Sequence, residues 1–239
     1  MSIFSLVVAR ENSKGLPQKT IQKINNKYVF EYTIEYSLAL SNIVPDDVVT
    51  VVSSDVEIIA DYCSQSAIPF IQRKPELASD AARIEDVIYD AYTTVARDYA
   101  YISLLYGNIP TRYTDEFLRA YEFMEKNAEY DAVLSMQNVE KFNPAWMFEY
   151  NTETLPMKIK EGYRRQDLKQ YMIHDSHTIL VRSDYFIKAM SGRSCGKVLY
   201  DAFGKKIKPL LNNKVVIDID TAKDLEIAES LLKGVVLKP

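Results

Sequence analysis

The sequence has few of the residues that build disulfide frameworks or zinc centres. Its 239 residues include two cysteines, Cys63 and Cys195, and two histidines, His174 and His177. The cysteines lie far apart and outside any C-x-x-C spacing, which favours free thiols in a reducing compartment. The histidines, three positions apart on an expected strand, would face opposite sides and could not bind zinc without other ligands.

Long hydrophobic runs and an excess of charge of one sign are also missing. No stretch approaches the roughly 20 apolar residues of a membrane span, and the apolar residues 3–9 follow no basic region. The 29 basic and 33 acidic residues give a net charge of −4 without a block of like charge. This balance does not suggest a nucleic-acid partner. We expect a cytoplasmic protein that binds neither nucleic acid nor membranes.

Glycine is scarce, with seven residues, and both glycine-rich phosphate motifs are missing. The chain contains no G-x-G-x-x-G, which marks dinucleotide binding, and no G-x-x-x-x-G-K-[ST], which marks P-loop NTPases. A Rossmann dehydrogenase is therefore disfavoured. Any phosphate site must be built locally, against a mildly acidic background.

Short apolar runs alternate with helical patterns along much of the chain. Strands are expected at residues 3–9, 47–53, 68–72, 101–105 and 131–137. Helices are expected at residues 28–40, 57–66, 84–97 and 114–126, the second opened by a capping box of Ser54 and Glu57. This α/β alternation predicts a mostly parallel sheet flanked by helices, in a single domain over residues 1–239. Ligands of such sheets bind beyond the carboxyl ends of the strands.

The pattern changes at about residues 140–182, which contain many aromatic side chains without the alternation of strands and helices. We expect strands and loops that leave the main sheet as a small arm. Aromatic density favours an interface between two copies, and packing on the chain's own domain is the alternative. Further along, a helix is expected at residues 183–190, a strand at 215–217 and a closing helix at 221–233.

A basic loop follows the first strand. Arg10, Lys14 and Lys19 lie close together, and Gly15 and Pro17 can bend the backbone. Such a loop can direct side chains and backbone N–H groups at a polyphosphate. On spacing alone, a basic surface turn explains it at least as well.

Four blocks, in order along nearly the whole chain, supply a resemblance. They are A-R-x-x-S-K-G-x-P-x-K from Ala9, R-x-P-E-L-A-x-D from Arg73, R-R-Q-D-L from Arg164 and D-I-D-T-x-x-D-L from Asp218. Together they resemble the cytidylyltransferases that make CMP-sialic acid, CMP-KDO and related CMP-nonulosonates. The resemblance implies a Rossmann-like nucleotidyltransferase fold and a homodimer joined by a dimerisation arm. It also implies transfer of CMP from CTP to an acidic sugar, with release of pyrophosphate, for cell-surface glycan biosynthesis.

The resemblance assigns roles to residues of the first two blocks and the last. Catalytic roles fall on Arg10, Lys14, Lys19 and Asp218. Nucleotide binding falls on Arg10, Ser13, Lys14, Gly15, Arg73 and Asp80. For Arg73 and Asp80, an ion pair that fixes a loop is an alternative of equal weight.

An acidic pair near the end of the chain suits a metal ion. Asp218 and Asp220 are two positions apart on an extended segment, so their carboxylates share one face. Such a pair can hold Mg²⁺, which prefers hard oxygen ligands. Asp220 or Thr221 could instead cap the last helix, because Thr221 and Asp224 fit a capping box.

The sugar side departs from the sialic-acid pattern. Residues 106–112 and 175–179 differ from the family's Q-P-T-S-P-x-R and N-G-A-I-Y, and Thr20 stands where the family has asparagine. These changes leave two alternatives to a CMP-nonulosonate enzyme. One is another NTP-sugar nucleotidyltransferase, and the other is a catalytically impaired nucleotide-binding homologue.

Substrate contacts are expected from residues that remain suited to a sugar: Tyr106, Asn108, Arg165 and Gln166. Arg165 is the candidate for a bidentate grip on the sugar's carboxylate. Its alternative is a structural pair with Asp167 or another acid.

Overall fold

The structure is a computed structural model that describes residues 2–11, 15–148, 164–192 and 201–233. Its centre is a seven-stranded sheet with the order β5-β4-β1-β6-β8-β7-β9. These strands are β1 Ser2–Val8, β4 Asp47–Ser54, β5 Phe70–Gln72, β6 Tyr101–Tyr106, β7 Ala132–Asn138, β8 Met172–Arg182 and β9 Ile207–Leu211. β8 runs antiparallel to its neighbours β6 and β7, and the other adjacent pairs are parallel. A small separate ribbon joins β2 Lys23–Ile24 to β3 Lys27–Tyr28.

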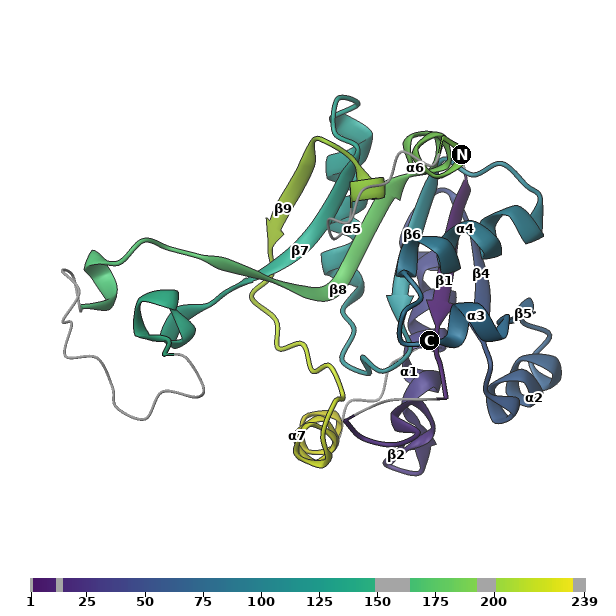
Figure 1. Cartoon of the computed structure of the whole chain (residues 1–239), viewed down its shortest axis with the longest axis horizontal. Coiled ribbons are helices and arrows are strands. Elements are labelled where there is room, and N and C mark those ends of the chain that lie inside the picture. Colours follow the sequence, from purple (N-terminus) through teal and green to yellow (C-terminus); the bar gives the residue numbers. More distant parts are fainter. Residues whose placement is uncertain (1, 12–14, 149–163, 193–200, 234–239) are drawn as a thin grey trace.

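Helices cover both faces of this sheet (Figure 1). They are α1 Val29–Ala39, α2 Glu57–Gln65, α3 Pro75–Ala78, α4 Ile84–Val95, α5 Thr114–Lys126, α6 Ser183–Ser191 and α7 Ala222–Leu232. Alternating side chains of β1 reach both layers: Ile3 and Val7 belong to the core with α1, α2 and α5, and Phe4 belongs to the core with α4 and α6. The expected helix-flanked, mostly parallel sheet is confirmed. None of the described helices has the length and apolar composition needed to cross a membrane.

Most expected elements lie within a few residues of their predicted bounds, but the start of α2 differs. Its N-cap is Val56, and Ser54 Oγ accepts a hydrogen bond from Val56 N at 3.1 Å. The capping box of Ser54 and Glu57 is therefore wrong, because Ser54 still belongs to β4. The second expected box is confirmed at the start of α7, where Thr221 N donates to the Asp224 carboxylate at 2.8 Å.

The final strand also differs from the expectation. Residues 215–217 form no strand, and the strand is β9, which precedes them and pairs with β7. β9 contains Pro209, which weakens a strand pattern but is tolerated in an edge strand. The later segment runs instead towards the loop after β6, where Ile217 N donates to Thr111 Oγ1 at 2.8 Å.

The expected arm needs a correction at its carboxyl end. Residues 179–182 of β8 pair with β6 and β7 inside the main sheet, because their apolar side chains are buried there. The end of β7 and the start of β8 leave the sheet together and lead to short 3-10 helices far from the other elements (Figure 1). These helices are Glu140–Phe142, Pro144–Trp146 and Arg165–Asp167. Residues 149–163, also part of the expected arm, lie outside the described residues.

His177, on β8, belongs to the interior of the fold. Its side chain is fully buried, and Nε2 accepts a hydrogen bond from Tyr113 N at 2.8 Å. Nδ1 then carries the proton of a neutral ring and lies 2.8 Å from Thr178 Oγ1. Burial, assisted by the charge of Arg112, lowers the pKa of His177 to about 3.

We predict that His177 makes the fold sensitive to acid. Its pKa is about 3 in the folded protein and about 6.5 in an unfolded chain, so the unfolded state binds the proton first. The stability from His177 is complete above about pH 6.5 and falls by up to about 1.4 kcal/mol per pH unit towards about pH 3. Urea unfolding between pH 7 and pH 4.5 should therefore show a smaller loss in His177→Gln, whose amide oxygen can accept the Tyr113 N–H. An equal loss in both proteins would contradict the assignment.

Candidate active site

A cleft of about 330 Å³ opens where β1 and β6 end. It is lined by side chains from the loops after β1, β5 and β6, from β8 and from the segment before α7. The predicted site residues that line it are Arg10, Lys19, Arg73, Asp80, Tyr106, Asn108 and Asp218. The structure thus brings together side chains from both ends of the chain, at the edge of the sheet where ligands of such folds bind.

Two arginines supply positive charge to the cleft by different means. Arg10 Nη1 pairs with Asp80 Oδ1 at 2.9 Å and donates to Ser79 O at 3.3 Å. Arg73 is buried, and its Nη2 donates to Ser53 O at 2.8 Å. Burial lowers the pKa of Arg73 to about 10, which leaves it charged at neutral pH. The ion pair expected in this region therefore includes Asp80, which pairs with Arg10.

The acidic pair lies beside a lysine and an amide. Lys19 Nζ pairs with Asp220 Oδ1 at 2.5 Å, and Asn108 Nδ2 donates to Asp218 Oδ1. Burial raises the pKa of Asp218, the charge of Lys19 opposes this rise, and the charge of Asp220 adds to it. The two carboxylates are therefore close enough to influence each other.

These residues fit a Mg²⁺ site of the open kind. The described part of the chain contains no group of three or more His, Cys, Asp or Glu side chains that could hold a metal ion. Mg²⁺ in phosphate chemistry is usually bound by one or two carboxylates together with waters and substrate phosphates. Asp218, which lines the cleft, and Asp220 provide such a pair. A metal would then bind best together with a polyphosphate.

Gly15 explains how the basic loop approaches the acidic segment. A Cβ atom at Gly15 would lie 2.3 Å from the carbonyl oxygen of Asp220, so a side chain would force the two segments apart. The predicted role of Gly15 in binding nucleotide thus has a packing component. Ser13 and Lys14, the other predicted residues of this loop, lie outside the described residues.

Arg165 and Gln166 do not line this cleft. Both are exposed in the 3-10 helix Arg165–Asp167 on the arm, away from the sheet (Figure 1). Arg165 Nη2 pairs with Glu140 Oε1 at 3.3 Å. A role in substrate binding therefore requires a second chain or a movement of the arm.

The cleft is also formed by three residues that were not assigned to the site from the sequence. Thr20 and Ser176 line it, and the hydroxyl of Thr20 is buried without a hydrogen-bond partner among the described residues. The replacement of the family's asparagine was a signal for Thr20, and Ser176 lies in the segment 175–179 that departs from the family's N-G-A-I-Y. Arg112 is buried and does not line the cleft. It fixes the backbone of two residues that do, because it donates to Tyr106 O at 2.9 Å and to Ser176 O at 3.2 Å.

Comparisons with known proteins agree on one family. The sequence profile described as cytidylyltransferase matches residues 4–233. An N-acylneuraminate cytidylyltransferase of Streptococcus agalactiae serotype V is 26% identical over 194 residues, which cover 80% of this chain and 46% of the relative. The chain thus spans about half the length of that relative. A pseudaminic acid cytidylyltransferase of Campylobacter jejuni is 29% identical over 250 aligned positions, covering 98% of this chain and 97% of the relative.

Solved structures share the fold at low sequence identity. A CMP:2-keto-3-deoxy-manno-octonic acid synthetase complexed with CTP superposes with a TM-score of 0.72 at 14% identity, covering 99% of this chain and 100% of that chain. A 4-diphosphocytidyl-2C-methyl-D-erythritol synthase from Anaerococcus prevotii gives a TM-score of 0.62 at 13% identity, covering 97% and 99%. At these identities the likeness establishes the architecture alone.

We predict that Gly15→Ala weakens polyphosphate binding without unfolding the protein. The added Cβ must move the basic loop away from Asp220, because it would otherwise lie far inside van der Waals contact with the Asp220 carbonyl oxygen. The affinity for inorganic tripolyphosphate with Mg²⁺, measured by calorimetry, should fall about tenfold, the equivalent of about 1.4 kcal/mol. Gly192→Ala is the matched control, because Gly192 ends α6 with a φ of −76°, which any residue adopts. Equal affinity in the two variants would contradict the packing role of Gly15.

Proposed function

The chain belongs to the cytidylyltransferase family, and we propose that it transfers CMP from CTP to an acidic, nonulosonate-like sugar with release of pyrophosphate. The observation behind this proposal is the cleft in which Arg10, Lys19 and Asp218 meet. Two relatives named for N-acylneuraminate and pseudaminic acid support an acidic sugar as acceptor. We further propose that the protein works in the cytoplasm, where CTP is present.

The proposed reaction needs no covalent intermediate on the protein. The sugar's anomeric hydroxyl attacks the α-phosphorus of CTP and loses its proton to water. A new P–O bond forms, and the bond to the leaving pyrophosphate breaks. Arg10 and Lys19 bind and neutralise the triphosphate, and the buried Arg73 adds positive charge from the wall. Mg²⁺, held by Asp218 and Asp220, would supply further charge neutralisation at the phosphates.

Lys19 and Asp220 would change partners when CTP binds. In the structure they form an ion pair between an almost buried amine and a largely exposed carboxylate. A triphosphate in the cleft offers Lys19 a stronger anionic partner and leaves the Asp220 carboxylate available to a cation. The pair thus keeps both groups in place before the substrate arrives.

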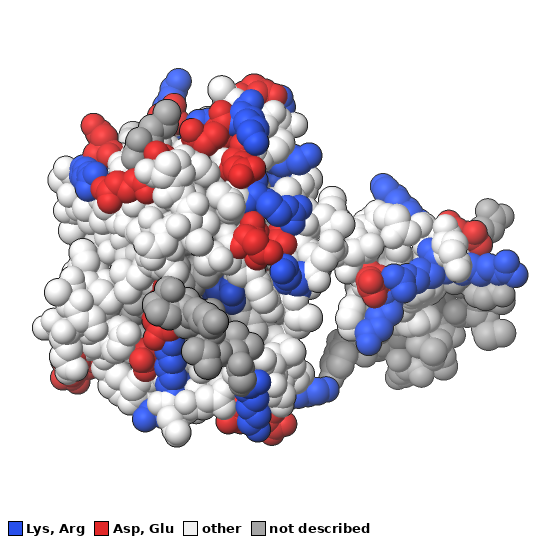
Figure 2. Space-filling model, turned by 180° about the vertical axis from the view of Figure 1, so that it is seen from behind, with Lys and Arg blue, Asp and Glu red and all other residues white. Residues whose placement is uncertain are grey.

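We propose that two chains form the complete enzyme. The arm exposes apolar side chains, namely Phe142, Trp146, Met147, Phe148, Met172 and Ile173. On the face shown in Figure 2, lysine and arginine side chains also gather on the arm. A two-fold dimer could cover the apolar side chains and bring Arg165 to the sugar's carboxylate in the partner's cleft.

Nucleotide choice tests the proposal first. With Mg²⁺ present, CTP should raise the melting temperature more than UTP, ATP or GTP, and the shift should grow with concentration by mass action. Differential scanning fluorimetry provides the measurement, with pyrophosphate release in the presence of N-acetylneuraminic or pseudaminic acid as a second readout. A larger shift with a purine nucleotide would exclude the cytidylyl assignment. Binding of CTP without turnover of either sugar would favour the impaired homologue.

Asp218→Asn and Asp220→Asn should each lower kcat at least about 100-fold while the protein stays folded, because a site that depends on charge loses half of its carboxylates. Calorimetry should also show weaker Mg²⁺ binding in the presence of CTP. The matched control is Asp224→Asn, which makes the same charge change nearby. It disrupts the capping box of α7 and should cost about 1 kcal/mol of stability with turnover retained. Normal turnover in Asp218→Asn would place the metal elsewhere.

Complementation tests the two-chain site. Arg165→Ala and Asp218→Asn chains, each inactive alone, should regain activity when mixed under conditions of subunit exchange. If Arg165 acts on the partner's cleft, one site of each mixed dimer contains both changes and the other contains neither. Exchange can be verified by mass spectrometry of differently tagged chains. Verified exchange without activity would assign Arg165 to its own chain.

A further inference from the structure

A bulge in β8 places Ser176 at the cleft. The pairing of β7 with β8 shifts register between Leu134 and Met136, which face Ile179 and His174 respectively. Four residues of β8 therefore stand opposite the single residue Ser135. Within this bulge Ser176 has a φ of 58°, a conformation uncommon for residues other than glycine and concentrated at functional sites.

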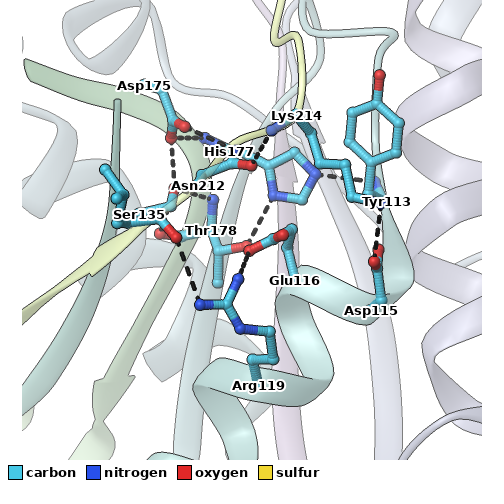
Figure 3. A network of polar contacts seen from close by, with 11 residues as sticks. Tyr113, Asp115, Glu116, Arg119, Ser135, Asp175, His177, Thr178, Asn212 and Lys214 are labelled. Carbon is cyan, nitrogen blue, oxygen red and sulfur yellow. Dashed lines mark hydrogen bonds and ion pairs between the residues drawn. The ribbon is translucent and has the colours of Figure 1, made fainter. Parts of the chain in front are cut away.

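The residue before Ser176 is Asp175, and its carboxylate accepts hydrogen bonds from a polar cluster on the sheet side of the bulge. Asp175 accepts hydrogen bonds from Ser135 Oγ, from Asn212 Nδ2 at 2.8 Å and from His177 N at 3.0 Å. Figure 3 shows these donors around the carboxylate, on β7, on β8 and just after β9. All three partners are buried or come from the bulge itself, so the Asp175 carboxylate is engaged inside the fold and does not line the cleft.

Arg112 also fixes the bulge, through hydrogen bonds to its backbone. Its buried guanidinium donates to the carbonyl oxygens of Ser176 and His177. Hydrogen bonds thus fix both the Asp175 side chain and the Ser176 carbonyl. Ser176 itself lines the cleft, so its side chain is available to a ligand there. Its hydroxyl makes no hydrogen bond with the described residues, and Ser176 is only half-buried.

The strand order indicates which substrate meets Ser176. Across the sheet, Arg73 and Asp80 follow β5 at one side, Arg10 follows β1 in the middle, and Ser176 lies on β8 beyond β6. The basic loop that would bind the phosphates therefore stands between the two ends of the cleft. If the nucleoside occupies the end near Arg73, the group joined to the α-phosphate must lie towards β6 and β8.

We propose that Ser176 is a sugar-binding residue of this chain and that Asp175, through its contacts with Ser135, Asn212 and His177, is the positioning residue that fixes Ser176 in the cleft. The proposal rests on the proposed function and adds the residues that select the acceptor. A serine hydroxyl both donates and accepts, so its partner is a hydroxyl or an acylamino group of the sugar. Arg112 is excluded as the receptor of the sugar's carboxylate, because backbone carbonyls occupy its guanidinium.

The test separates sugar binding from nucleotide binding. In Ser176→Ala, the KM for the sugar probe should rise about tenfold, as expected for one lost hydrogen bond, with the KM for CTP within about twofold of its original value. N-acetylneuraminic and pseudaminic acid are the two probes, assayed by pyrophosphate release and by saturation-transfer NMR on the CTP-loaded protein. Ser176→Gly keeps the positive φ without strain and should behave like Ser176→Ala.

Asp175→Asn tests the positioning role. Its amide cannot accept all three donors, so the sugar KM should rise similarly, and the double variant with Ser176→Ala should be no worse than the poorer single variant. Asp115→Asn is the matched control, because Asp115 pairs with Lys214 on the surface and lies outside the bulge. It should leave both KM values unchanged.

Several results would overturn the inference. An unchanged sugar KM in folded Ser176→Ala and Ser176→Gly would remove Ser176 from the sugar site, and a parallel rise in the KM for CTP would move it to the nucleotide site. Additive effects of Asp175→Asn and Ser176→Ala would refute the positioning role. If the original chain binds CTP but neither binds nor converts either sugar, the acceptor assignment of the proposed function fails, and the inference fails with it.

Discussion

The ion pair between Lys19 and Asp220 joins segments that lie 201 positions apart in the chain, and the candidate site depends on this meeting. Gly15 allows the approach because no side chain stands between the basic loop and the Asp220 carbonyl. Asn108 extends the contact, since its side chain donates to Asp218 and its carbonyl accepts from Ile219 N at 3.0 Å. Charges of both signs are thereby fixed around one cleft before any ligand binds, which reduces the reorganisation that binding requires.

The part of this arrangement that the sequence predicts is local. The run at residues 3–9 and the helices that follow have clear periodicity, so β1 and its flanking helices were expected, and the strand ends indicated where a ligand would bind. The capping box of Thr221 and Asp224 was also visible, because it is a contact between near neighbours. The assignment of Lys19 and Asp220 to one site rested on resemblance, since no local pattern joins the two ends of a chain, and their ion pair was not predicted.

The parts that the sequence did not predict depend on long-range packing. The insertion of β8 between β6 and β7 makes residues 179–182 a central strand, although the segment before them leaves the sheet. The positive φ of Ser176 is imposed by the partners of Asp175 and by Arg112, which come from three other segments. No role was assigned to Arg112 from the sequence, and the structure buries it inside the fold. Arg165 shows the converse case, because resemblance assigned it to the sugar and the structure places it exposed on the arm, outside the cleft.

The central claim is that this chain attaches a nucleoside monophosphate, and specifically CMP, to an acidic sugar. Identification of the product by mass spectrometry and ³¹P NMR tests it most directly, after incubation of the protein with CTP, Mg²⁺ and either N-acetylneuraminic or pseudaminic acid. The account predicts a phosphodiester with a single phosphorus resonance and the mass of CMP joined to the sugar, formed together with pyrophosphate. A nucleoside diphosphate sugar made from a sugar phosphate, or the same product formed more readily from another nucleotide, would contradict it.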